Sequence, residues 1–78
     1  MDLNTKTIYI RLLDEGTEVA RPTQGVLLKD DLYRVLSTPD YNPDDEQWEF
    51  PPESIVRCRM EEWTDGEVFM AYELVKNT

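Results

Sequence analysis

The chain has 78 residues, 40% of them hydrophobic, and a net charge of −9 from 8 Lys and Arg against 17 Asp and Glu. Its length allows one small domain, and its apolar content argues against wholesale disorder. The negative charge disfavours direct binding to nucleic acid and to anionic membranes, because their phosphate groups would be repelled.

The residue inventory also argues against catalysis and metal binding. The chain has no His and a single Cys, so it lacks the commonest general base and cannot form an internal disulfide or a structural zinc site. A lone thiol is typical of a reducing compartment. The N-terminus does not resemble a signal peptide, and no apolar run approaches the roughly 20 residues that span a bilayer. We therefore expect a cytoplasmic protein that is not an enzyme and needs no cofactor.

The N-terminal third shows the two-residue period of β-strands. In residues 7–13, Ile8, Ile10 and Leu12 alternate with polar side chains or Tyr, which predicts a half-buried strand. Residues 14–17 supply a turn, and residues 18–23 follow as the return segment of a hairpin. Pro22 lacks an N–H, so we expect it at a sheet edge, a bulge or a strand end.

A second hairpin is predicted from residues 26–28 and 32–36, which flank a turn at residues 29–31. A helix over residues 27–36 is the alternative, because several of its apolar residues also fit helical spacing. The β-prone run from Tyr33 to Val35 and the absence of a clear N-cap favour strands.

The C-terminal half begins with a loop. Residues 37–47 contain two Pro, Asn42 and four acids, a loop composition. Residues 55–60 alternate and predict a strand with Val56, Cys58 and Met60 inward and Arg57 and Arg59 in water. Residues 64–66 form the clearest hairpin turn. The strand from Glu67 to Val75 comes next, and it is apolar on both faces: one face carries Val68, Met70, Tyr72 and Leu74, and the other Phe69, Ala71 and Val75.

Short strands joined mainly by hairpins leave open sheet edges, and closure of the sheet removes these edges. We therefore expect an all-β fold, a small five-stranded, partly open barrel of SH3-like shape. The single domain covers residues 1–78, with residues 1–6 and 76–78 as frayed tails.

Three sequence pieces resemble a group of short, uncharacterised bacterial proteins. They are R-L-L-D-E-G from Arg11 to Gly16, Arg21-Pro22, and W-E-F-P-P-x-S-x-V-R-C from Trp48 to Cys58. The resemblance spans most of the chain and implies a compact β-rich fold. It implies no activity and no catalytic residue.

The stretch between Leu36 and Arg57 is the most distinctive part of the sequence. It holds six carboxylates and no basic residue, interspersed with Tyr41, Trp48 and Phe50. Aromatic side chains among acids are typical of a docking surface for a basic protein, but Trp48 and Phe50 are equally suited to a core. The candidate contact residues are Tyr41, Asp44, Asp45, Glu46, Trp48 and Glu49.

Two chemical alternatives in the chain are weaker. Asp40-x-Asn42-x-Asp44 matches the start of a calcium-binding EF-hand loop, but Asp45 replaces the required Gly and Pro51 the bidentate Glu, so we assign no metal. Cys58 has no His partner and lies on the inward face of its predicted strand, which favours a core thiol over a nucleophile.

Two functions from different classes remain. The first is a protein-interaction module that binds a basic or mixed protein partner, in a sharper form an inhibitor or immunity-type protein. The second is a homo-oligomeric structural protein, for example a homodimer, that pairs through an open sheet edge or through the strand from Glu67 to Val75.

Overall fold

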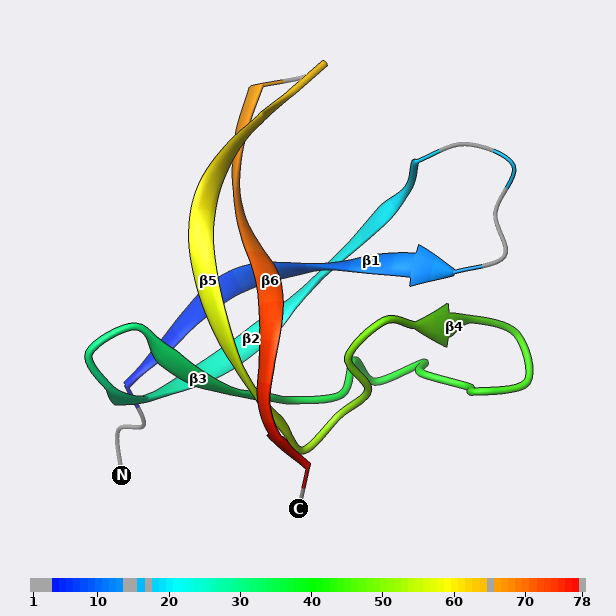
Figure 1. Cartoon of the computed structure of the whole chain (residues 1–78). Coiled ribbons are helices and arrows are strands. Elements are labelled where there is room, and N and C mark those ends of the chain that lie inside the picture. Colours follow the sequence, from blue (N-terminus) through cyan, green and yellow to red (C-terminus); the bar gives the residue numbers. More distant parts are fainter. Residues whose placement is uncertain (1–3, 14–15, 17, 65, 78) are drawn as a thin grey trace.

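The computed structural model describes residues 4–13, 16, 18–64 and 66–77, and within these ranges the chain forms six strands and no helix (Figure 1). The strands are β1 (Thr5–Leu13), β2 (Ala20–Lys29), β3 (Leu32–Val35), β4 (Gln47–Trp48), β5 (Ser54–Trp63) and β6 (Gly66–Asn77). The predicted all-β class is therefore confirmed.

Five of the described strands close into a ring. The sheet order is β2-β3-β5-β6-β1-β4, and β2 also pairs with β1. The ring closes through one parallel pair, Tyr9 with Met70, whereas its other pairings are antiparallel. In Figure 1 the twisted β5–β6 ribbon crosses the β1–β2 ribbon. The short β4 lies outside the ring, where Trp48 pairs with Leu12, and the loop composition of residues 37–47 does not predict it.

The strands extend further than the sequence predicts. Thr5 and Lys6, expected in a frayed tail, pair with Val26 and Gly25. At the other end of the chain, Lys76 pairs with Ile55. The prediction of frayed tails is wrong at these positions, because neighbouring strands of the ring supply hydrogen-bond partners. Residues 1–3 and 78 of the predicted tails lie outside the described residues.

The strand β2 is continuous, although the sequence predicts two separate segments, residues 18–23 and 26–28. Its first seven residues pair with β1, and from Gly25 onward it pairs with β3. Among the described strands, Pro22 therefore has a strand neighbour on one side only. This is the predicted edge position, which suits a residue that has no N–H to donate. The segment over residues 27–36 is a hairpin and not a helix, with Asp30 at its turn in the left-handed region (φ 52°).

Two bulges on β6 change the side-chain alternation expected there. Arg57 pairs with Glu73 but Cys58 pairs with Ala71, so Tyr72 is an extra residue, and a similar shift falls between Ile55 and Val56. An extra residue reverses the facing of the side chains after it. The expectation that Leu74 shares one face with Val68 and Met70 is therefore wrong: Met70, before the extra residue, is fully buried, whereas Leu74, after it, is 42% exposed.

The hairpin of β5 and β6 projects beyond the ring. β3 pairs with β5 only as far as Arg57, and past that point the hairpin continues to the pair Trp63–Gly66 (Figure 1). Met60 lies on this projecting part and is 54% exposed, so its predicted inward position is wrong. The predicted turn at residues 64–66 is described only in part: Gly66 has φ 128°, and residue 65 lies outside the described residues.

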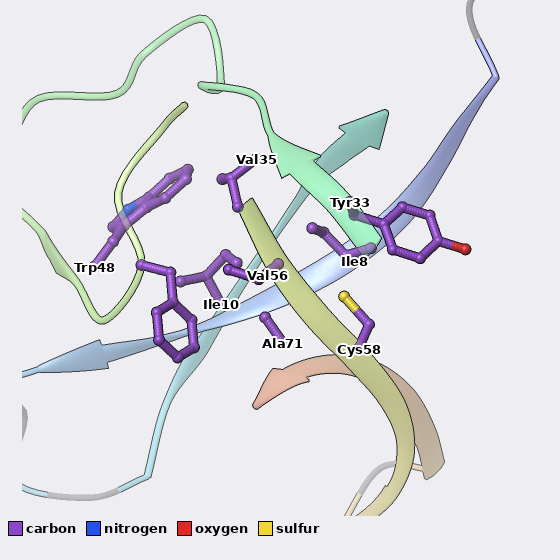
Figure 2. Close-up of a cluster of buried hydrophobic side chains, with 9 residues drawn as sticks. Ile8, Ile10, Tyr33, Val35, Trp48, Val56, Cys58 and Ala71 are labelled. Carbon is purple, nitrogen blue, oxygen red and sulfur yellow. The ribbon is translucent and has the colours of Figure 1, made fainter. Parts of the chain in front are cut away.

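The core lies within the ring, and Trp48 lies at one side of it (Figure 2). Phe50 belongs to the same buried cluster. Val56 and Cys58 face inward as predicted, and so do Ile8 and Ile10. The buried cluster consists of Ile8, Ile10, Tyr33, Val35, Trp48, Phe50, Val56, Cys58 and Ala71. The cluster includes residues of every ring strand except β2, and Leu27 of β2 packs against it, so the ring strands share one centre of apolar packing among the described residues.

The turn into β5 holds a strained residue. Ser54 N–H donates to the carbonyl of Pro51 (3.1 Å), and Glu53 within this turn has φ 78°, a conformation that favours glycine. We expect Glu53→Gly to be about 1 kcal/mol more stable than Glu53→Ala, because both lose the carboxylate but only glycine removes the strain. Urea denaturation of the two variants measures the difference, and equal stabilities would mean that the turn relaxes at no cost.

Candidate functional site

The acidic loop, residues 37–49, is organised by backbone and Asn42 contacts. Asp45 N–H donates to the carbonyl of Asn42 (2.9 Å), and the Asn42 Oδ1 accepts from Asp44 N–H (2.9 Å). An Asn side chain that binds the backbone two residues on fixes a tight turn. The Glu49 N–H donates to the carbonyl of Arg11 (2.8 Å), which ties the end of the loop to β1.

The aromatic residues of the loop point toward the core. Trp48 is 4% exposed, and its Nε1–H donates to Glu46 Oε1 (3.0 Å). Tyr41 packs edge-on against Trp48, with 4.7 Å between ring centroids, and is half-buried. Glu46 in turn forms an ion pair with Arg21 of β2. Trp48 and Glu46 therefore hold the loop on the ring, and Trp48 offers almost no surface to a partner.

Four carboxylates of the acidic loop are exposed: that of Asp40, and those of the three predicted contact residues Asp44, Asp45 and Glu49. Within the described part of the chain, none of the three forms an ion pair; Asp45 accepts a hydrogen bond from the Asn42 amide (3.3 Å). Of the six predicted contact residues, the structure thus places three acids on the surface together with part of Tyr41. Their uncompensated charge gives this face a negative local potential.

A second polar cluster joins β1 and β5 outside the acidic loop and was not predicted. Glu61 accepts hydrogen bonds from Arg11 (3.0 Å), Trp63 (3.1 Å) and Arg59 (3.2 Å). Burial alone would raise the pKa of Glu61, but the indole N–H of Trp63 and the two guanidinium groups outweigh burial and lower it. Glu61 therefore stays ionised and fixes the position of Trp63.

A groove of about 530 Å³, the Trp63 groove, opens between the start of β2 and the tip of the β5–β6 hairpin. Its apolar lining comes from Tyr9, Val19, Ala20, Trp63 and Val68. Glu18 and Glu67 also line it. In the sequence, the groove could be recognised only from a Trp between Glu62 and the 64–66 turn, and this pattern by itself indicates part of a hairpin. The strand pairing that brings β2 close to this hairpin cannot be read from the sequence.

Cys58 is a core thiol, 4% exposed. Burial, with a smaller contribution from Asp31, raises its pKa from 9.0 to about 12. We expect a thiol reagent at neutral pH to label the folded protein about a thousandfold more slowly than the urea-unfolded protein, since a rise of three pKa units lowers the thiolate fraction by that factor. Labelling followed by mass spectrometry tests this; similar rates in both states would contradict the inward position of Cys58.

Among the described residues, no three His, Cys, Asp or Glu side chains group as metal ligands, and no helix is long and apolar enough to cross a membrane. Comparison of the chain with protein-family models, with curated proteins and with solved structures gives no significant match.

Proposed function

We propose that this chain is an acidic protein-interaction module of the cytoplasm, an SH3-like barrel in shape, that binds a basic or mixed-charge protein. The observation that carries the proposal is the exposed set of Asp44, Asp45 and Glu49, which has no cationic partner among the described residues and lies on a loop fastened to the core by Trp48. A rigid negative surface of this kind attracts a positive surface at long range and costs little ordering when the complex forms.

A sharper form of the proposal is an inhibitor or immunity-type role. A basic surface that binds nucleic acid would be attracted by the same carboxylates, and the net charge of −9 adds to the attraction. Under this proposal, Tyr41 supplies apolar contact area beside the acids, since it remains partly exposed where it packs on Trp48.

The test is capture of the partner from an extract of the native cell. The wild-type chain, immobilised at low salt, should retain a basic protein that Asp44→Asn with Asp45→Asn retains weakly. The control is Asp30→Asn with Asp31→Asn, which removes the same formal charge at the β2–β3 turn together with the Asp31–Arg57 ion pair (3.0 Å), and it should retain the partner normally. Equal retention by all three chains would contradict a role for the acidic loop.

Homo-oligomerisation is the second candidate, and exposed apolar side chains on β6 favour it. Leu74 and Val75 are 42% and 43% exposed, and among the described strands the side of β6 away from β5 is paired only at Met70. A second copy could cover both features. Size-exclusion chromatography with light scattering distinguishes the candidates, because a stable dimer supports this one and a monomer supports the first.

A further inference from the structure

The tip of the β5–β6 hairpin places like charges opposite each other. Glu62 and Glu67 are direct cross-strand partners, both are exposed, and no described cation forms an ion pair with either. Like charges at directly opposite positions destabilise a strand pair. A cation bound near this position would relieve the repulsion, so the tip is electrostatically complementary to a positive ligand.

A third carboxylate, that of Glu18, lies close by. Glu18 lines the Trp63 groove, and it shares a smaller adjoining hollow with Glu62 and Trp63. Its side chain is 76% exposed and 3.8 Å from Arg11, whereas Arg11 is only 3.0 Å from Glu61. The charge of Arg11 is thus directed mainly to Glu61, and Glu18 can pair with a second cation.

The groove also offers apolar surface and an open strand edge. Trp63 and Val68 line it. The indole, held by Glu61, already has the Arg11 guanidinium over its ring, 5.8 Å from the centroid, so the ring is a suitable surface for a guanidinium or for an aliphatic stem. From Gly66 to Phe69, β6 pairs with β5 on one side, and on its other side it has no strand partner within the described residues. Such an edge can accept an added strand.

We infer that the Trp63 groove binds an extended segment of a basic protein, which adds to the edge of β6 and places an arginine side chain over Trp63 and among Glu18, Glu62 and Glu67. The inference rests on the proposed function in taking the partner to be basic, but it assigns a contact that shares no residue with the acidic loop. Arginine suits the site better than lysine, because its planar group can stack on the indole while it pairs with carboxylates.

The test is an NMR titration of the full chain with the peptide acetyl-Thr-Val-Arg-Val-Thr-amide. The Trp63 indole N–H and the amides of Gly66 to Phe69 should shift saturably. A peptide with citrulline, the neutral isostere of arginine, should bind about fivefold more weakly, as expected for losing ion pairs at a partly exposed site. No shift of these signals, or equal affinity for the two peptides, would overturn the inference.

Variants locate the interaction. Glu62→Gln with Glu67→Gln should remove most of the preference for arginine and should not destabilise the fold, since it removes a repulsion. Asp44→Asn with Asp45→Asn is the matched control and should leave peptide affinity unchanged. Concentration-dependent shifts of the same amides without peptide would overturn the inference in favour of a second copy of this chain. If the peptide does not bind to the groove but partner capture still depends on Asp44 and Asp45, the proposed function stands without this contact.

Discussion

Replacing Trp48 by Ala is expected to lower the free energy of unfolding by about 3–5 kcal/mol, the cost typical of truncating a buried aromatic side chain. Trp48 is 4% exposed, belongs to the buried cluster and supports Tyr41. A scaffold of this size without disulfides has roughly 3–5 kcal/mol of stability, so the variant should be largely unfolded in water.

Urea denaturation followed by circular dichroism measures this loss, and Trp63→Ala is the matched control. Trp63 is only partly buried and makes one side-chain hydrogen bond, to Glu61, so its truncation should cost no more than about 2 kcal/mol. Equal losses for the two substitutions would mean that Trp48 is not the more deeply packed residue.

The second large effect concerns the close contact between β1 and β2. A Cβ at Gly25 would lie 2.8 Å from Ile8 Cδ1 and 3.3 Å from Tyr33 Cβ. Gly25→Ala is therefore expected to cost about 1–3 kcal/mol through overpacking of a full core. Ile8→Val removes the Cδ1 atom and costs about 0.5–1.5 kcal/mol by itself.

The double variant tests the contact directly. Loss of Cδ1 removes the shortest of these contacts and leaves the one with Tyr33 Cβ at 3.3 Å. The double variant should therefore be about 1 kcal/mol more stable than the sum of the single losses predicts. A double-mutant cycle from urea denaturation provides this coupling energy. Strict additivity would contradict the packing of Gly25 against Ile8.

The local patterns of the sequence were sufficient to predict the class of the fold. Alternation in residues 7–13 identified Ile8 and Ile10 as core, and alternation in residues 55–60 placed Val56 and Cys58 inward. These predictions succeeded because a half-buried strand exposes every second side chain, a property that a single segment encodes. The hairpin at Asp30 was predictable for the same reason, since turn residues act locally.

Features that depend on distant segments were not predictable. The bulge at Tyr72 separates the buried Met70 from the exposed Leu74, and no pattern within β6 reveals it, because a bulge is defined by the register with β5. Ring closure likewise depends on the pair Tyr9–Met70, and these two residues are 61 positions apart in the chain (70 − 9).

The two Trp residues show the same limit at the candidate site. Trp48 and Trp63 both stand among acids in the sequence, yet the first is in the core and the second lines an open groove. Their difference comes from topology: β4 pairs with Leu12 of β1 next to the core, whereas Trp63 lies at the end of a β5–β6 hairpin that continues beyond the pairing with β3. Composition locates acidic aromatic segments, whereas exposure depends on topology.

The central claim, that exposed acids recruit a basic partner, is tested most directly by association kinetics. With the captured partner, stopped-flow measurements should show that Asp44→Asn with Asp45→Asn slows association at low salt and flattens its dependence on ionic strength, while dissociation changes little. Charges separated by more than about 8 Å are screened at 0.15 M salt, so the two chains should converge as salt rises. Association rates that are equal at low salt and share one salt dependence would contradict the claim.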